Sequence, residues 1–525
     1  MAGPSEYNVD LTAAYVDATV PVADYLVLVP VVVPLVVAAL SLMLRRQPHV
    51  QPILAGITLT AVFASNVALA ARVMESGPVF MAMGRWLPPF GISFNADALG
   101  VLMALTASLV SLVCVLYSSL SIDASGRRYG FYPFLLMLTA GVSGAFLTAD
   151  IFNLYVWFEV LLIASFGMLI LGNSLGQLDG AVKYAFLNLI ATTLFLLAIG
   201  YTYGLFGTLN MADLAIQIAA AEDKPLGTLV VLFVFAFAMK AAAFPLNFWL
   251  PASYHTPNIV TSAVFAALLT KVGVYALLRV GGMLFPGTFG DLQTILVWVA
   301  ALTSLLGATG ALASSDIRRM LGYLVISGIG AMFVGVAVAT PDGLRGTVLY
   351  AVHSILVIAA LYLAAGVIGR KTGSFDLREV GGLYRAHPYF AALFLILAFA
   401  VSGLPPFSGF WPKVLLVQAS MVAGQSWLTA AYLLSSFIAM IAIGRVWLFA
   451  FWRSEVNGEP ATIMALSEAE TRAFLIPITV LVFVVVAVGL VPNPVISMAQ
   501  VAAFGLIDPS AYINAISPVL PQVLP

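Results

Sequence analysis

The chain has 525 residues, of which 62% are hydrophobic and 9% are charged, with a mean hydropathy of +1.06 and a formal net charge of -1. Soluble domains carry about 25% charged residues, so this composition excludes a soluble protein and predicts an integral membrane protein. The near-neutral charge gives no basis for nucleic-acid binding, and one cysteine excludes a disulfide framework or a cysteine-ligated metal site.

Apolar stretches long enough to cross a bilayer recur along the whole chain. A membrane helix needs about 20 such residues. The fourteen predicted spans are 25–44, 52–73, 97–119, 130–149, 153–172, 183–205, 227–252, 259–281, 290–312, 320–339, 344–368, 389–421, 427–451 and 473–493. The seventh and twelfth are long and contain internal prolines. The preceding segment 1–24 is acidic and has no basic region, so we expect no cleaved signal peptide.

The basic residues between the spans predict the orientation of the chain. With the N-terminus outside, thirteen of them lie inside: Arg45, Arg46, Arg127, Arg128, Lys183, Arg318, Arg319, Arg370, Lys371, Arg378, Arg385, Arg453 and Arg472. Five lie outside: Arg72, Arg85, Lys224, Arg279 and Arg345. Because cytoplasmic loops carry an excess of Lys and Arg, we expect both termini to be outside.

Two proline-interrupted segments resemble each other. FAMKAAAFPLNFWLP (237–251) and FAVSGLPPFSGFWPK (399–413) both begin with Phe-Ala and reach Phe-Trp eleven residues later. Their offset of 162 residues, from Phe237 to Phe399, covers five spans, so the two copies run in opposite directions. Inverted repeats with broken helices are typical of transporters.

The sequence therefore predicts an all-α polytopic membrane protein with about 14 transmembrane helices and two inverted five-helix repeats, each containing a broken helix. The expected segments are an outer N-terminal segment, three N-terminal helices, the first repeat, the second repeat, and a last helix with a C-terminal tail. Their boundaries are 1–24, 25–129, 130–289, 290–452 and 453–525. The outer segment 1–24 and the tail 494–525 are candidates for contacts with partner proteins.

Few charged residues lie inside the predicted spans. They are Lys240, Lys271, Lys413 and Arg445, with Glu159 as the one acid well within a span. A charge at the centre of a membrane helix costs about 2.5–3.5 kcal/mol on insertion scales, and such residues normally face a wet cavity or the bundle interior. Arg445 lies near a helix end, where its side chain can reach the interface.

Lysines in this setting suit proton exchange. Burial disfavours a charged amine, and a nearby carboxylate favours it, so a movable carboxylate can switch a lysine between its two forms. Glu159 in span five is the expected partner of Lys240 in span seven; the alternative is a static ion pair that orients the two helices. Lys271 lies near the centre of span eight and Lys413 follows the second break. For these two, the alternative is an anchor that extends to the interface.

Three further residues are candidates. His353 in span eleven is surrounded by apolar residues, and a neutral imidazole both donates and accepts, so it can bridge a proton path; the alternative is a core histidine. His255 lies in an inner loop after the first break, where it is either a position of proton uptake or simply a solvated residue. Lys183 lies at the inner boundary of span six. An interfacial anchor is the default interpretation for Lys183, and an accessory proton site is the alternative.

These residues lie in segments that resemble a known family. GAVKYAFLNLIATTLFLLAIGYTYGLFGTLN, MKAAAFPLNFWLPASYHTPNIVTSAVFAALLTKVGVYALLR and SSDIRRMLGYLVISGIGAMFVG are similar to the proton-translocating membrane subunits shared by respiratory complex I, membrane-bound hydrogenases and Mrp-type antiporters. The likeness covers roughly spans three to thirteen. Within the family, FPLNFWLP followed by ALLTKVGVY looks most like the D subunit of Mrp-type multisubunit sodium/proton antiporters.

The resemblance implies a function. Residues matching the family's proton relay are Glu159, Lys240, Lys271, His353 and Lys413. It implies a multi-pass subunit of a bacterial cell membrane antiporter, without a cofactor, that assembles with partners like the A, B, C, E, F and G subunits of Mrp-type antiporters and couples proton movement to Na⁺ export. One departure is SYHTPN, where His255, Thr256 and Asn258 replace the usual residues of the loop.

Two other functions remain open on the sequence. The chain can be a proton-pumping subunit of a redox-driven complex, with the redox groups in other subunits, or a scaffold that binds partner helices and conducts nothing. A sodium site wants several oxygen ligands, often carboxylates. Since Glu159 is the one clear intramembrane acid, we expect the sodium path to lie in a partner protein of the complex or at a shared interface.

Overall fold

The computed structural model describes residues 21–221, 226–454 and 466–516. The predicted outer segment 1–24 therefore lies mostly outside the described residues, as does Lys224. The described part is mostly helical, but it also contains a small antiparallel sheet of β1 (Val79–Ala82) and β2 (Ser93–Ala96). The predicted helical fold class is confirmed, and this short hairpin is an addition that the sequence did not predict. The hairpin follows the second helix, where short alternating segments flank a turn rich in Gly and Pro, and pairing satisfies their backbone groups.

The helices follow one another with short connections. In the first part they are η1 (Val22–Val27), α1 (Val29–Met43), α2 (Gln51–Ser76), η2 (Met83–Arg85), α3 (Ala98–Ser121), α4 (Ala124–Arg128), α5 (Phe131–Leu147), α6 (Ile151–Leu169), α7 (Leu175–Phe206) and α8 (Met211–Ala219). Then come α9 (Leu226–Ala241), α10 (Trp249–Ser253), α11 (Ile259–Val264), η3 (Phe265–Leu269), α12 (Thr270–Ala276), η4 (Leu277–Leu284), α13 (Pro286–Asp291) and α14 (Gln293–Ala313). The last part comprises α15 (Ile317–Val338), α16 (Pro341–Thr372), α17 (Leu383–Ala386), α18 (Pro388–Ser402), α19 (Phe410–Val422), α20 (Ser426–Val446), η5 (Trp447–Trp452), α21 (Glu468–Leu490), α22 (Asn493–Ile507) and α23 (Ser510–Asn514).

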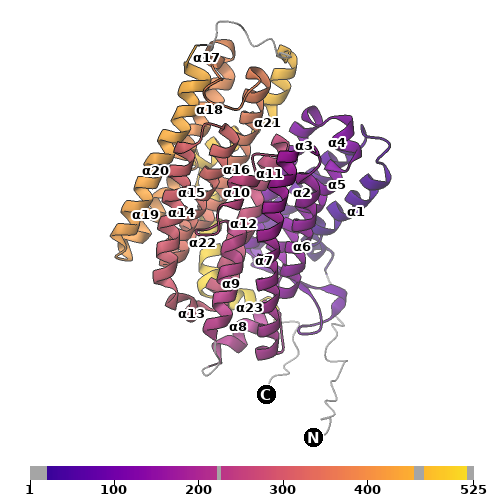
Figure 1. Cartoon of the computed structure of the whole chain (residues 1–525). Helices are drawn as coiled ribbons and strands as arrows, with labels where there is room; N and C mark the ends of the chain where they lie inside the picture. Colours follow the sequence, from indigo (N-terminus) through magenta and orange to yellow (C-terminus); the bar gives the residue numbers. More distant parts are fainter. Residues whose placement is uncertain (1–20, 222–225, 455–465, 517–525) are drawn as a thin grey trace.

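The bundle has two ends, which Figure 1 shows at bottom and top. The end with β1, β2, α8, α13 and α23 is called the hairpin face, and the end with α4 and α17 the α17 face. Both described ends of the chain lie at the hairpin face, since η1 contacts the two strands and Asn95 Nδ2 donates to the carbonyl of Tyr512 at 3.0 Å. Within the described residues, 10 helices are long and apolar enough to cross a membrane, and shorter apolar helices accompany them.

The C-terminal region departs from the predicted division into a last span, 473–493, and a tail. After α21 the chain forms a further apolar helix, α22, which packs on α3 and α16 with Met498, Ala499 and Ala502 buried. Much of the predicted tail therefore lies inside the bundle. The prolines Pro492 and Pro494 interrupt the helix, so the apolar pattern stops at Pro492 in the sequence although the bundle continues beyond it.

Matching features occur at opposite ends of the bundle. An isolated antiparallel bridge joins Asp150 to Asn210 at the hairpin face, and another joins Asp316 to Asp376 at the α17 face. Each pair is 60 residues apart (210 minus 150, 376 minus 316), and the helices between them, α7 and α16, are each 32 residues long.

Two helices are interrupted, as their prolines predict. α9 ends before Ala242 (φ 60°) and α18 ends before Gly403 (φ 81°), both in the left-handed region. The next amide then bonds five residues back, from Ala243 to Ala238 at 2.9 Å and from Leu404 to Phe399 at 3.1 Å. These end residues are 161 positions apart (403 minus 242), one fewer than the 162 of the Phe-Trp pairs. α10 and α19 then continue the crossing.

Candidate functional site

Lys240 lies in the last turn of α9, directly before the first break, and is 8% exposed. Its Nζ is 5.5 Å from the centroid of the Phe158 ring. Beside it is a cavity of about 20 Å³ lined by Phe158, Leu161, Leu162, Tyr184, Asn188, Trp249 and Leu269. That volume accommodates about one water molecule. Tyr184 shares a hydrogen bond of 2.8 Å with Ser165, so polar groups extend from this cavity between α6 and α7.

Glu159 lies on α6, next to Phe158, and its Oε1 is buried with no hydrogen-bond partner among the described residues. Glu159 interacts electrostatically with Lys240, but no ion pair joins the two side chains in the described part of the chain. The static ion pair is therefore not the arrangement that the structure contains. An unpaired buried carboxylate oxygen is costly, and this oxygen remains available to accept a hydrogen bond.

Lys271 is fully buried in α12. Its Nζ donates to the carbonyl of Ala266 at 2.7 Å, within the π-helical segment η3. Such segments shift the hydrogen-bond pattern of a helix and occur frequently at functional sites. Two residues later, a Cβ on Gly273 would lie 2.7 Å from Ala241 N and 3.0 Å from the Lys240 carbonyl carbon. The helix that carries Lys271 thus packs directly on the first break.

His353 and Lys413 meet at the second break. His353 is 3% exposed on α16, and its Nδ1 shares a hydrogen bond of 2.8 Å with Ser408 in the break. Lys413, in the first turn of α19, donates to the carbonyls of Val401 and Ser402 at 2.9 and 3.0 Å. Those carbonyls end α18, so the ammonium lies at the negative end of that helix.

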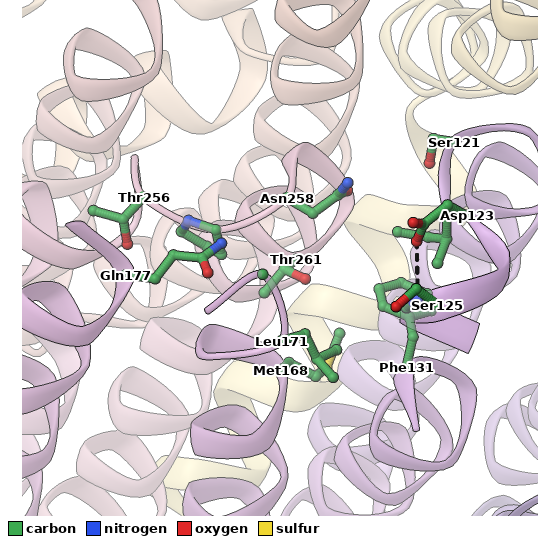
Figure 2. Close-up of a pocket in the computed structure, with 14 residues that line it drawn as sticks. Ser121, Asp123, Ser125, Phe131, Met168, Leu171, Gln177, Thr256, Asn258 and Thr261 are labelled. Carbon is green, nitrogen blue, oxygen red and sulfur yellow. Dashed lines mark hydrogen bonds between the residues drawn. The ribbon is translucent and has the colours of Figure 1, made fainter. Parts of the chain in front are cut away.

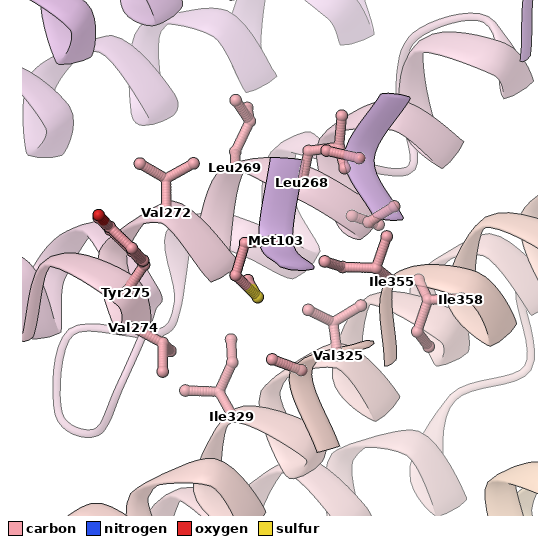
Figure 3. Close-up of a cluster of buried hydrophobic side chains, with 14 of the residues drawn as sticks. Met103, Leu268, Leu269, Val272, Val274, Tyr275, Val325, Ile329, Ile355 and Ile358 are labelled. Carbon is pink, nitrogen blue, oxygen red and sulfur yellow. The ribbon is translucent and has the colours of Figure 1, made fainter. Parts of the chain in front are cut away.

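The structure therefore brings the predicted residues together in two groups, one at each break. Buried apolar side chains surround the helix that carries Lys271. Figure 3 shows Met103 and Val274 on the side of Val325 and Ile329 of α15, with Ile355 of α16 in the same apolar layer. His353 interacts electrostatically with both Lys271 and Lys413, but within the described residues no hydrogen bond crosses this apolar layer.

His255 and Lys183 lie apart from the two groups. His255 is half-buried in the loop between α10 and α11, where Nδ1 lies 2.8 Å from the carbonyl of Pro251. Burial first, and then the charge of Arg319, lower the pKa of His255, which favours the neutral ring. Lys183 is on the surface of α7, 2.5 Å from Asp179 one turn earlier.

A cavity of about 510 Å³ opens near the α17 face, between the ends of α3, α4, α6 and α7 and the loop that contains His255. Figure 2 shows Asp123, Gln177, Asn258 and Thr261 around it. Thr261 is fully buried, and its Oγ1 has no hydrogen-bond partner among the side chains that the structure describes. A cavity with such a group is suited to hold water.

Sequence reasoning missed one buried charged group. Arg279, expected in an outer segment, lies instead in η4, is 1% exposed and forms an ion pair of 2.6 Å with Asp97, 182 residues away. Asp97 also accepts from Gly100 N at 2.9 Å as the N-cap of α3. The signal in the sequence was the apolar surroundings of Arg279 (VYALLRVGGML), which continue the span beyond residue 281.

The chain is similar to known proteins over most of its length. Residues 148–439 match the family model described as NADH:quinone oxidoreductase/Mrp antiporter, transmembrane. The D subunit of a Na⁺/H⁺ antiporter from Alkalihalophilus pseudofirmus is 35% identical over 492 residues, 94% of this chain and 99% of its own length.

Two solved structures are also similar. A chain of the Mrp complex from a Dietzia species superposes with a TM-score of 0.87 at 29% identity, covering 96% of this chain and 100% of that one. A chain of respiratory complex I from Thermus thermophilus gives 0.78 at 27% identity, covering 92% and 99%. The chain belongs to the NADH:quinone oxidoreductase/Mrp antiporter transmembrane family.

Proposed function

We propose that this chain is the proton-translocating subunit of a multisubunit Na⁺/H⁺ antiporter in a bacterial cell membrane, and thus a transporter subunit rather than an enzyme. The observation that carries the proposal is the burial of Lys240 and Lys271 without an ion-pair partner among the described residues, beside a broken helix. The similarity to the D subunit of an antiporter over nearly the whole of both chains supports the same function.

Protons enter this route from the α17 face, which we assign to the inside from the excess of basic residues. The polar cavity near Thr261 takes up water, and Tyr184 and Ser165 lead toward the small cavity beside Lys240. A proton on Lys240 is held in place by Glu159 and released when that carboxylate moves away, because a nearby negative charge favours the ammonium.

The second half of the route leads through Lys271 to His353 and Lys413, and from Lys413 to the hairpin face outside. The imidazole of His353 can accept a proton at one nitrogen and release one at the other. Its bond to Ser408 orients the ring toward the second break. Because the layer in Figure 3 is apolar, transfer from Lys271 to His353 needs water to enter it, and this wetting step separates the two halves of the cycle.

We also infer about fourteen crossings and two inverted five-helix repeats. The bridges at opposite faces with equal 60-residue spacing support the repeats, and so does the shared backbone pattern at the two breaks. The fourteenth crossing then comprises α21 and α22. A Cβ on Gly489, near the end of α21, would lie 2.0 Å from the carbonyl of Pro406, so this crossing bends at the level of the second break.

Sodium requires partner proteins in this proposal. An alkali cation needs several oxygen ligands, and the one acid deep in the predicted spans, Glu159, is assigned to Lys240. The partners are other membrane proteins of the complex, like the A, B, C, E, F and G subunits of Mrp-type antiporters, and the sodium path lies in them or at their interface with this chain. A Na⁺ ion bound deep in this chain by its own residues alone would overturn that view.

A redox-driven pump subunit is the second candidate, favoured by the similarity to a chain of Thermus complex I. The lower TM-score of 0.78 at 27% identity, against 0.87 at 29% for the chain of the Mrp complex, makes it second. The genes beside this one distinguish the two: small antiporter subunits fit the first proposal, and flavin or iron–sulfur subunits fit the second.

The experiment is to express the complete complex in a host without its own sodium antiporters. Salt-resistant growth and Na⁺-dependent proton movement in everted vesicles are measured for Lys240→Ala and Lys413→Ala. We expect both variants to lose antiport while the complex assembles. Arg385→Ala, which removes an exposed cation at the α17 face, is the control and retains transport. If the lysine variants assemble and transport normally, the chain is a scaffold and the proposal fails.

A further inference from the structure

Arg279 is buried at the hairpin end of the helix that carries Lys271. Lys271, Tyr275 and Arg279 follow one another at four-residue intervals, and Arg279 Nε donates to the Tyr275 hydroxyl at 3.2 Å. A polar line therefore runs from the central lysine toward the face that the proposed orientation places outside. Without a barrier, this line would connect Lys271 directly to the outer water.

The guanidinium of Arg279 is enclosed on every side that the structure describes. Nη2 donates to Asp97 Oδ1 at 2.6 Å, and Nη1 lies 3.5 Å from the sulfur of Met283. The rings of Tyr275 and Tyr512 lie 5.3 and 4.9 Å from its central carbon. Tyr512 belongs to α23, so the last described helix covers the arginine from the hairpin face.

Two properties of this arrangement stop proton movement. A relay group has to accept a proton and release one, but a guanidinium has five donors, no acceptor and stays protonated. The Tyr275 hydroxyl donates its own proton to the carbonyl of Phe146 at 2.7 Å.

We propose that Arg279, held by Asp97, is a proton barrier that closes the first repeat toward the outside. Lys271 then exchanges protons with the first break and with His353, and never directly with the outer water. This inference rests on the proposed proton route. The barrier explains why a proton on Lys271 passes to His353 and does not escape directly to the outside. Stability alone does not require this pair, because replacing a buried ion pair by apolar residues is often neutral or stabilising.

The other repeat contains a comparable arginine. Arg445, near the α17 end of α20, donates to the carbonyl of Leu312 in the last turn of α14. Leu312 precedes Asp316 by four residues, as Phe146 precedes Asp150 (316 minus 312, 150 minus 146). A cation thus lies beside equivalent helix ends at opposite faces, which suits two repeats that each open to one side.

The test measures proton leak in the purified complete complex, reconstituted in liposomes without Na⁺, under a K⁺ diffusion potential and with a pH dye inside. Arg279→His replaces the barrier by a group that accepts and releases protons, and we expect a leak about tenfold above wild type, the factor for lowering a barrier by about 1.4 kcal/mol. Arg345→His is the matched control, since Arg345 pairs with Asp342 at 2.7 Å near the hairpin face but is partly exposed. It leaks no more than wild type.

A second variant addresses misfolding. Asp97→Asn with Arg279→Gln removes both charges together, so no uncompensated charge remains buried, and it too leaks more than wild type. Adding Lys271→Ala to Arg279→His abolishes the extra leak, because the path begins at Lys271. The proposal is overturned if Arg279→His or the double variant Asp97→Asn with Arg279→Gln assembles and leaks protons at the wild-type rate. Failure of the antiport proposal appears separately, as normal antiport in Lys240→Ala, and leaves the leak result intact.

Discussion

Replacing Gly403 by alanine tests whether Lys413 has to occupy the end of α18. Gly403 has φ 81°, and an added Cβ would lie 2.4 Å from Cδ and 3.3 Å from Nζ of Lys413. Left-handed backbone costs an ordinary residue roughly 1–2 kcal/mol. The lysine stem has to move as well, and Nζ then loses its bonds to Val401 and Ser402. A hydrogen bond to a charged group contributes about 1.5–3 kcal/mol.

A second glycine with a similar backbone angle serves as the control, because replacing it by alanine causes the backbone strain without displacing the lysine. Gly424 has φ 72° and nothing within 4 Å of an added Cβ, so Gly424→Ala carries the strain alone. Losing about 1.5 kcal/mol at Lys413 lowers the population with a correctly placed lysine about tenfold. We expect Na⁺-dependent proton movement in everted vesicles to fall about tenfold in Gly403→Ala and to remain near wild type in Gly424→Ala. Equal antiport in the two variants, at equal amounts of assembled complex, would refute the role assigned to Lys413.

Three further variants test other parts of the structure. Tyr184→Phe removes the bond to Ser165 and, at a stability cost of about 0.5–1.5 kcal/mol, lowers the antiport rate severalfold in assembled complex; an unchanged rate excludes this uptake path. Burial raises the pKa of Asp150 from 3.8 to about 6, so its carboxylate destabilises the fold increasingly as pH rises from 3.8 to 6, by about 3 kcal/mol above that range. Asp150→Asn therefore melts at a higher temperature than wild type in detergent at pH 7.5, and the difference shrinks toward pH 4; a pH-independent difference contradicts this reasoning. Lys183→Ala removes a surface pair worth about 0.2–1 kcal/mol and leaves antiport unchanged, whereas a loss would place Lys183 on the proton route.

The sequence alone predicted most of the helices because the bilayer imposes a simple rule. A segment of about 20 apolar residues has to be helical in lipid, since every backbone group needs a partner within the segment. The predicted spans accordingly fall on described helices. Two of them fall on a broken pair, and span 259–281 falls on the continuous run Ile259–Leu284. The breaks were also predictable, because a proline inside a helix removes a donor and clashes with the preceding turn.

Isolated charges were equally visible in the sequence, but their partners were not. Lys240 and Lys271 stand out against apolar neighbours, and the structure confirms that they are buried. Glu159 was expected to pair with Lys240, yet its side chain makes no such contact in the described residues. Whether two side chains meet depends on helix rotation and packing, which hydropathy does not report.

The tertiary structure alone decided the contacts between distant segments. Arg279 was counted with the outer cations because it lies two residues before the predicted end of its span at 281. Only packing placed it against Asp97, 182 residues away, and under Tyr512. The same holds for α22, which hydropathy separated from the bundle at two prolines. Hydropathy determines which segments enter the membrane, because lipid is a uniform solvent. Which polar groups then face one another is decided by side-chain packing between helices.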